Sequence, residues 1–475
     1  MPVDAAYRPD PLFQSLGPAF ADTVTPARFP VHIPRFTNRF WARRIGLGDF
    51  DPAEWERCFA RFEPLPDNME RPLAIRYHGH QFRVYNPDIG DGRGFLYAQL
   101  RDDRGRLLDL ATKGSGQTPY SRLGDGRLTL KGGVREVLAA QMLDAQGVYT
   151  SKPFALYETG EALTRGDEPS PTRSAVLTRL SHAHIRFGVF ERLAFVNDPD
   201  AMRALVDHCA EAYFPEIASV SDGARPAALL DAVVQETARL VASWMAAGFV
   251  HGVMNTDNMT VTGESFDYGP WRFAPASIPG FTAAYFDQQG LYCFARQPEA
   301  AAWNLAQLGG SLTLISDAAP LEDALRAFPT RYRSALRTAL FRRLGLIEGD
   351  LERDLAFVQA LLSWLTDSAA PWPAFFHDWF CGAASETRAM ESPAQANYQR
   401  ADFAPIRDGF AARTPERPER LTHPLFQRDA AVSLLIDEVE ALWAPIAADD
   451  DWSAFAAKLD DIAALREALA IANPM

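Results

Sequence analysis

The chain is poor in cysteine. Only four of its 475 residues are cysteines, and no two of them form a Cys-x-x-Cys pair. A disulfide framework and a zinc site of the usual spacing are therefore not expected. This composition is typical of a protein that works in a reducing cytosol.

Long apolar stretches are also absent. No segment approaches the roughly 18 consecutive apolar residues that a membrane helix needs. The chain opens with Met-Pro-Val-Asp-Ala, which carries an acid early and has no apolar core, unlike a signal peptide. We therefore expect a soluble, cytoplasmic protein with no membrane partner.

Basic charge is in deficit. The chain has 47 Lys and Arg residues against 61 Asp and Glu residues, which gives a net charge of −14. A protein that binds nucleic acid through a broad basic face is therefore not expected, whereas a local cluster of cations for phosphates is compatible with this charge balance. A Walker A phosphate loop and internal repeats are missing as well. Hydrophobic content of 47% is that of an ordinary globular protein.

The pattern along the chain changes from strands to helices. Alternation and turn residues predict strands at 81–85, 95–100, 107–113 and 174–178, with one helix at 134–146 that stops at Gly147. Beyond about residue 195 helical spacing dominates, and a run from 229 to 244 is closed by Gly248. This order indicates an α+β enzyme of two lobes. We expect an extension that packs on the lobes (1–70), a β-rich N-lobe that binds nucleotide (71–195), a helical C-lobe (196–415) and a helical tail (416–475).

Residues 251–258, His-Gly-Val-Met-Asn-Thr-Asp-Asn, have the layout of a kinase catalytic loop, and Asp-Tyr-Gly follows at 267–269. Asn258 and Asp267 are then the expected ligands of a divalent metal ion, which prefers oxygen donors. The position of the kinase base, five residues before Asn258, holds Val253. The alternative is that Asp267 is a turn residue beside Gly269 and that Asn258 caps a helix or turn.

A lysine and a glutamate complete the kinase-like pattern. Lys113 ends a predicted strand, and Glu136 lies 23 residues on, in the first predicted helix. Such a pair can hold an ammonium group against phosphates. The alternative is an exposed ion pair of little energetic value.

Two glycine-rich turns and two arginines are further candidates for phosphate contact. Gly90, Gly92 and Gly94 allow backbone amides to approach phosphates closely, and Arg93 in the same turn adds a cation. A plain hairpin turn explains this cluster equally well, and the second turn at Asp125 and Gly126 is ambiguous in the same way. The remaining pair consists of Arg179 and Arg186, which suit bidentate phosphate recognition or, alternatively, structural salt bridges.

The chain resembles the selenoprotein O family, called YdiU in bacteria. The resemblance is carried by Lys-Gly-Ser-Gly-Gln-Thr-Pro-Tyr-Ser-Arg at 113–122, Gly-Asp-Gly-Arg at 124–127, Val-Arg-Glu at 134–136, His-Ile-Arg-Phe-Gly at 184–188, the 251–258 loop and Asp-Tyr-Gly-Pro at 267–270. It covers roughly residues 75 to 310. It implies a protein-kinase-like bilobal fold, with a small β-rich N-lobe containing one key helix and a larger, mainly helical C-lobe. ATP would be bound in a flipped orientation.

The resemblance also implies an activity and a set of site residues. Such enzymes transfer AMP from ATP to Ser, Thr or Tyr hydroxyls of proteins, and UMP transfer from UTP with manganese is attributed to the bacterial branch. Lys113 would contact phosphates, Glu136 would hold it, and Asp257 would accept the proton. Asn258 and Asp267 would carry Mg²⁺ or Mn²⁺. The residues that would line the nucleotide are Gly90, Gly92, Arg93, Lys113, Asp125, Gly126, Arg179, Arg186 and Asp267.

The sequence departs from the family pattern in several places. Lys-Gly-Gly at 131–133 replaces Arg-Ser-Ser, and the segment 284–287 is altered. A cysteine near the carboxyl terminus is missing, since the last cysteine is Cys381, so redox control through a terminal thiol is not expected. Two rival functions stay open: a phosphotransferase acting on a small molecule or a protein, and a catalytically inactive ATP-binding scaffold.

Overall fold

The computed structural model describes residues 2–166 and 168–471. Its centre is an eight-stranded antiparallel sheet in the order β1-β3-β6-β7-β10-β9-β2, with β8 pairing to β10. The strands of this sheet are β1 (Ala21–Thr23), β2 (Ile33–Thr37), β3 (Leu73–Ile75), β6 (Leu96–Arg101), β7 (Leu107–Lys113), β8 (Leu128–Thr129), β9 (Lys152–Leu163) and β10 (Thr172–Ser181). The N-terminal 70 residues thus supply the two edge strands, β1 and β2.

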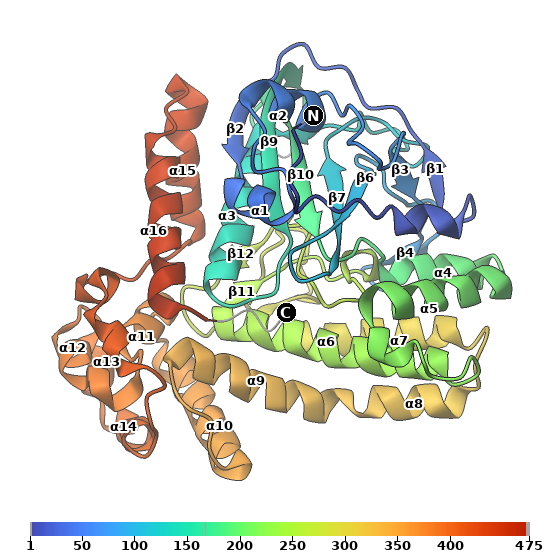
Figure 1. The fold of residues 1–475 in the computed structure, drawn as a ribbon. Coiled ribbons are helices and arrows are strands. Elements are labelled where there is room, and N and C mark those ends of the chain that lie inside the picture. Colours follow the sequence, from blue (N-terminus) through green and yellow to red (C-terminus); the bar gives the residue numbers. More distant parts are fainter. Residues whose placement is uncertain (1, 167, 472–475) are drawn as a thin grey trace.

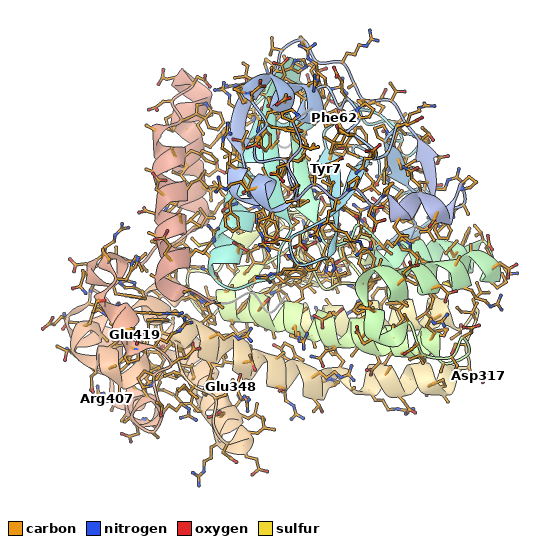
Figure 2. The ribbon with its side chains drawn as sticks, viewed as in Figure 1. Tyr7, Phe62, Asp317, Glu348, Arg407 and Glu419 are labelled. Carbon is orange, nitrogen blue, oxygen red and sulfur yellow. The ribbon has the colours of Figure 1, made fainter. Side chains whose placement is uncertain are left out.

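Both faces of the sheet are buried, and β7 shows how one strand serves two cores. Leu108 and Leu110 face a core built with the N-terminal segment, whereas Leu107 and Ala111 face the core that contains α3 (Leu130–Ala145). The N-terminal segment covers its face with aromatic side chains. Figure 2 shows Tyr7 and Phe62 over the sheet, where the Phe62 ring meets Phe95 at 5.3 Å between centroids.

The sheet-rich part lies over a layer of helices (Figure 1). The helices and short strands of this layer are α4 (Phe187–Phe195), α5 (Pro199–Tyr213), α6 (Arg225–Ala247), β11 (Phe249–Val250), β12 (Arg272–Phe273), α7 (Gln297–Leu312), α8 (Ala318–Arg326) and α9 (Phe328–Leu344). Five more helices stand beside the layer: α10 (Leu351–Ser368), α11 (Trp372–Asp378), α12 (Glu386–Glu391), α13 (Gln395–Tyr398) and α14 (Ala404–Ala411). Among the described residues, no helix is long and apolar enough to cross a membrane.

Most elements predicted from the sequence are present, and the α+β class is confirmed. The predicted hairpin corresponds to β6 and β7, and α6 ends where Gly248 adopts a left-handed conformation (φ 68°). The helix predicted at 134–146 begins earlier, at Leu130, because the Thr129 side chain accepts a hydrogen bond from the Gly132 amide and caps it. Two further short helices lie between β2 and β3 along the chain, α1 (Arg39–Arg44) and α2 (Pro52–Phe59).

The strand predicted at 81–85 is wrong. The chain forms a tight hairpin there instead, β4 (Gly79–Gln81) and β5 (Val84–Asn86). Its turn consists of Phe82 (φ 51°) and Arg83 (φ 64°), both in the left-handed region that two-residue hairpin turns require and that Asn and Gly usually fill. Contacts with the rest of the protein hold this turn, since the Phe82 amide donates to Asn255 Oδ1 at 3.0 Å.

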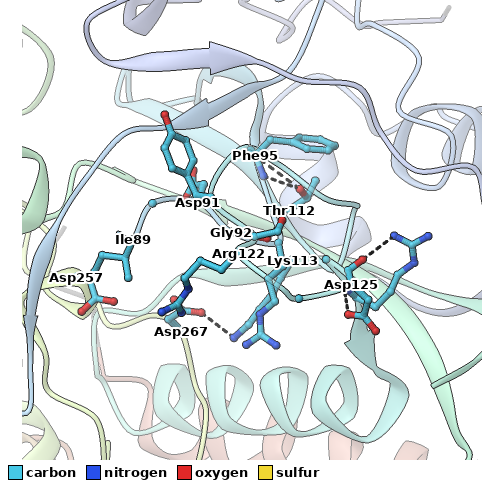
Figure 3. Close-up of a pocket in the computed structure, with 18 of the residues that line it drawn as sticks. Ile89, Asp91, Gly92, Phe95, Thr112, Lys113, Arg122, Asp125, Asp257 and Asp267 are labelled. Carbon is cyan, nitrogen blue, oxygen red and sulfur yellow. Dashed lines mark hydrogen bonds and ion pairs between the residues drawn. The ribbon is translucent and has the colours of Figure 1, made fainter. Parts of the chain in front are cut away.

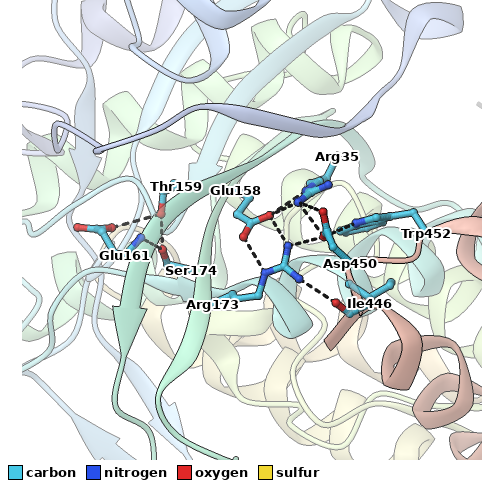
Figure 4. A network of polar contacts seen from close by, with 9 residues as sticks. All are labelled: Arg35, Glu158, Thr159, Glu161, Arg173, Ser174, Ile446, Asp450 and Trp452. Atoms are coloured by element: carbon cyan, nitrogen blue, oxygen red, sulfur yellow. Dashed lines mark hydrogen bonds and ion pairs between the residues drawn. The ribbon is translucent and has the colours of Figure 1, made fainter. Parts of the chain in front are cut away.

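The last two helices of the described residues, α15 (Ile436–Asp449) and α16 (Ser453–Leu469), form a hairpin that stands beside α3 (Figure 1). A charge network joins its bend to the sheet (Figure 4). Arg35 on β2 and Arg173 on β10 each contact both Glu158 on β9 and Asp450 at the bend. Farther along, Arg466 on α16 donates to Asp144 on α3 at 2.9 Å. The hairpin therefore covers the outer side of α3.

Candidate active site

A cavity of about 710 Å³ opens at one end of the sheet. Its walls are the loop between β5 and β6, the end of β7, the turns at 120–127, β10 and two acidic residues from the helical part. The volume is typical of a site for a small molecule or nucleotide. The residues predicted from the sequence that line it are Gly90, Gly92, Arg93, Lys113, Asp125, Gly126, Arg179, Arg186, Asp257 and Asp267. Figure 3 shows several of them from close by.

Lys113 is the last residue of β7 and is almost fully buried, with 6% of its side chain exposed. Its Nζ contacts the carboxylate of Glu136, which α3 presents from behind the cavity, and also lies 2.7 Å from Asp267 Oδ1. A buried ammonium group needs such partners, because an unpaired buried charge is strongly unfavourable. The two carboxylates fix the ammonium group at the cavity wall.

Asp267 brings three cations together. Besides Lys113, Arg179 Nη1 lies 3.2 Å from Oδ1 and Arg186 Nη2 lies 4.0 Å from Oδ2. Burial alone would raise the pKa of Asp267, but these cations outweigh it and hold the pKa well below its ordinary value. The backbone of Asp267 is also left-handed (φ 63°), a conformation that is unusual for any residue other than glycine. The carboxylate is therefore held ionised at the point where the cations converge.

Asp257 supplies a carboxylate with different surroundings. It lies in a short 3₁₀ turn, Thr256–Asn258, and its Oδ2 accepts a long hydrogen bond of 3.4 Å from Gln81 Nε2. Its Oδ1 is buried and has no hydrogen-bond partner among the described residues. Burial raises the pKa of Asp257 to about 6, against the opposing charge of Arg186. Such a group can take up a proton from a substrate hydroxyl near neutral pH.

The donor set expected for a metal ion consists of oxygens. The Asn258 Nδ2 group donates to the Val253 carbonyl at 2.9 Å, which leaves its amide oxygen as the available donor. Asp267 adds a carboxylate, and this pair suits Mg²⁺ or Mn²⁺ with phosphates completing the coordination. In the described part of the chain no group of three or more His, Cys, Asp and Glu residues is placed to hold a metal. Asn258 directly follows Asp257 in the chain but is not among the residues that line the cavity.

The glycines of the two turns are required by close packing. A Cβ atom on Gly90 would lie 2.5 Å from the Tyr120 ring, and one on Gly92 would lie 2.9 Å from the Tyr120 carbonyl oxygen. Gly126 (φ 70°) meets Gly116 in the same way, at 2.2 Å. These positions therefore need glycine even without a ligand. Asp125 is paired with Arg165 at 2.8 Å at the rim.

Comparison with known proteins identifies the family. A family model described as protein adenylyltransferase SelO matches residues 4–463. The chain belongs to the SelO family. The protein nucleotidyltransferase YdiU of Trichodesmium erythraeum is 43% identical over 463 residues, which cover 94% of this chain and 96% of that protein. The protein of the same name from Synechocystis sp. is 43% identical over 464 residues, with the same coverage. That of Pseudomonas putida strain GB-1 is 38% identical over 371 residues, covering 77% of this chain and 74% of the relative.

The resemblance inferred from the motifs is therefore confirmed, and with it the class of enzyme that the SelO name describes, a protein nucleotidyltransferase. Of the predicted site residues, Glu136 and Asn258 are the two that stand outside the cavity lining. Glu136 nevertheless reaches the site through its ion pair with Lys113.

The structure also adds residues that the sequence had not singled out. Asp91 Oδ1 accepts from Arg186 Nη1 at 2.6 Å, and Arg186 lies over the Tyr77 ring at 4.5 Å. A signal for Asp91 was present, because it stands between two glycines predicted to line the nucleotide. Arg122 ends the 113–122 motif that carries the family resemblance, but it was not assigned to the site. Gln81 carried no such signal, since it reaches the cavity only through the folding of the β4–β5 hairpin.

Proposed function

We propose that this SelO-family chain is a metal-dependent protein nucleotidyltransferase that moves AMP from ATP to Ser, Thr or Tyr hydroxyls of proteins, or UMP from UTP. The observation that carries the proposal is the pairing of two features in one cavity. Cations for phosphates converge on Asp267, and a separate carboxylate, Asp257, has an oxygen without a partner among the described residues. The position of the kinase base holds Val253, which does not line the cavity.

A protein-kinase-like bilobal arrangement is part of this proposal. Lys113 ends β7, Glu136 lies on α3, which packs against β9 and β10, and Asp267 lies in the loop that joins β11 to β12 after α6. These are the relative places of the corresponding parts in a kinase. We assign residues 71–195 to the nucleotide-binding lobe and 196–415 to the helical lobe, with 1–70 and 416–475 as additions to them.

The cations would hold the triphosphate, because phosphoryl and nucleotidyl transfer depend mainly on position and charge. Lys113, kept in place by Glu136, would contact phosphate oxygens. Arg179 and Arg186 would clamp the terminal phosphate with their planar forks. Asn258 and Asp267 would hold Mg²⁺ or Mn²⁺, which neutralises phosphate charge when bound. The remaining wall of the nucleotide site would consist of Gly90, Gly92, Arg93, Asp125 and Gly126.

Asp257 would act as the proton acceptor. The acceptor hydroxyl oxygen bonds to the α-phosphorus, the bond from that phosphorus to the bridging oxygen breaks, and pyrophosphate leaves. The hydroxyl proton passes to Asp257 Oδ1, the oxygen that has no partner among the described residues. Its pKa of about 6 leaves the carboxylate largely ionised at neutral pH and therefore able to accept the proton.

Two labels on ATP test the proposal. The chain is incubated with Mg²⁺ or Mn²⁺, a bacterial lysate, and ATP labelled at either the α- or the γ-phosphate. Label on protein from the α position, with loss of that label in Asp257→Asn, is the expected result. Label from the γ position alone would show a phosphotransferase. Binding of ATP in a thermal-shift assay without any transfer would show an inactive scaffold.

A further inference from the structure

The turn at residues 118–124 lies directly on the glycine-rich loop at 89–95. Thr118 Oγ1 donates to the Asp91 carbonyl at 2.6 Å, and Ser121 Oγ donates to the Gly92 carbonyl. The Tyr120 ring occupies the space that a Cβ atom on Gly90 would need. The glycines of one loop therefore allow the other loop to approach the cavity.

Arg122 stands in this turn with a strained backbone. Its φ of 54° is in the left-handed region, where a residue with a side chain is disfavoured. The turn is closed by a hydrogen bond of 2.7 Å from the Gly124 amide to the Ser121 carbonyl. Strain of this kind persists where the surrounding structure imposes it, and it is concentrated at ligand sites. Arg122 is an exposed residue, and its side chain is among those that line the cavity (Figure 3).

The charges around the cavity are nearly all matched. Of the Lys and Arg residues that line it, the ones with a carboxylate partner are Lys113 with Glu136 and Asp267, Arg127 with Glu161, Arg165 with Asp125, Arg179 with Asp267, and Arg186 with Asp91. Within residues 2–166 and 168–471, no side-chain partner is found for the other two, Arg93 and Arg122. Arg93 already belongs to the proposed nucleotide wall. Arg122 is the remaining cation, and it also borders a second cavity of about 480 Å³.

We propose that Arg122 is a nucleotide-binding residue whose guanidinium group donates to a phosphate oxygen at the open side of the cavity. The inference rests on the proposed function, because it needs a nucleotide in this cavity. A planar guanidinium fork matches phosphate oxygens, and no carboxylate competes for this one. The close packing of Tyr120 on Gly90 and Gly92 then has a functional consequence, since it places the cation.

The test compares ligands that differ in their phosphates. Binding of ATP, ADP, AMP and adenosine to the full chain is measured by calorimetry with Mg²⁺ present. In Arg122→Ala the Kd for ATP should rise about tenfold, the size expected for one partly exposed charge-assisted hydrogen bond. Adenosine should bind as it does to the wild type. Arg122→Lys should recover part of the affinity, since it restores the charge without the fork.

Two further variants serve as controls. Arg104→Ala removes an exposed arginine from the β6–β7 turn, away from the cavity, and should leave ATP binding unchanged. Arg122→Gly removes the cation while easing the backbone, so an equal loss in the glycine and alanine variants shows that the guanidinium group is responsible. Thermal unfolding without nucleotide confirms that the turn variants are folded.

The inference is overturned if Arg122→Ala binds ATP as tightly as the wild type, including the case in which only transfer to protein falls, which would place Arg122 at the acceptor. Equal weakening of adenosine and ATP would also overturn it, since the loss would not concern phosphates. Failure of the wild-type chain to bind ATP at all would instead overturn the proposed function, together with this inference.

Discussion

The charge network at the bend of the C-terminal hairpin allows a quantitative test of what attaches the hairpin to the sheet. Glu158 is the buried member, with 8% of its side chain exposed, whereas Asp450 is 50% exposed. Both carboxylates accept from the same two arginines at 2.6–2.9 Å. Each carboxylate is therefore the substitute partner if the other is neutralised.

The structure sets the expected magnitudes. Breaking a fully buried ion pair costs about 3–5 kcal/mol, and an exposed pair contributes about 0–1 kcal/mol. Glu158→Gln keeps the size of the side chain and leaves Asp450 to both arginines, so we expect a loss of about 2 kcal/mol. Asp450→Asn should cost about 1 kcal/mol, because the group is half-exposed and Asn tolerates its left-handed backbone (φ 53°). The double variant should lose about 4 kcal/mol, which is more than the sum.

This excess has a simple cause. In the double variant Arg35, 12% exposed, and Arg173, 29% exposed, keep their charges with no carboxylate of the network left beside them. A double-mutant cycle measures the coupling directly as the difference between the double loss and the two single losses. Here it should be about 1 kcal/mol.

Urea unfolding followed by tryptophan fluorescence gives the free energies, and limited proteolysis reports release of the hairpin. Asp200→Asn serves as a control, since its ion pair with Arg203 has side chains 95% and 58% exposed and should contribute almost nothing. Strict additivity of the two variants would refute the idea that the carboxylates substitute for each other. A Glu158→Gln variant as stable as the Asp200→Asn control would refute the whole network.

Three further outcomes are expected. Asp267→Ala should abolish both transfer and the metal-dependent thermal stabilisation by ATP, because it removes the proposed metal ligand; unchanged activity would rule out the site. Gly90→Ala should weaken ATP binding measured by calorimetry, since the new Cβ atom would lie 2.5 Å from the Tyr120 ring, and adding Tyr120→Ala should relieve the steric part of the loss. Burial raises the pKa of Glu264 from 4.5 to about 8, so the folded chain holds a proton that the unfolded chain has lost, and stability falls as pH rises through this window. Glu264→Gln should therefore show a smaller fall in melting temperature between pH 6 and pH 9 than the wild type.

Local signals were sufficient for the elements whose neighbours in sequence are also their neighbours in space. The β6–β7 hairpin was predicted because its two apolar runs flank a turn that contains Gly105. The end of α6 was predicted from Gly248, because glycine is favoured just after a helix C-terminus. In the structure Gly248 takes the left-handed conformation that explains this preference. In the site, the Lys113–Glu136 pair was predicted from its spacing along one strand and the next helix.

Elements held by distant contacts were missed. The β4–β5 turn uses Phe82 and Arg83 where local rules expect Asn and Gly, and it is kept by contacts with residues about 170 positions away, such as Asn255. The early start of α3 was hidden by Gly132 and Gly133, which are poor helix formers. A Cβ atom on Gly133 would lie 2.5 Å from Leu156, so packing against β9 explains that glycine.

The position of the missing kinase base and the proposed proton acceptor lie in one short loop, residues 251–258. Asn258 donates to the carbonyl of Val253, which ties the place of the missing base to the proposed metal ligand. Asp257, one residue before Asn258, lines the cavity and carries a buried oxygen with no partner among the described residues, whereas Val253 does not line it. In the proposed function, a flipped nucleotide presents its α-phosphate to the acceptor hydroxyl, and the terminal phosphate lies beside Arg179 and Arg186. Asp257 is then the carboxylate proposed to take the hydroxyl proton, in place of the kinase base.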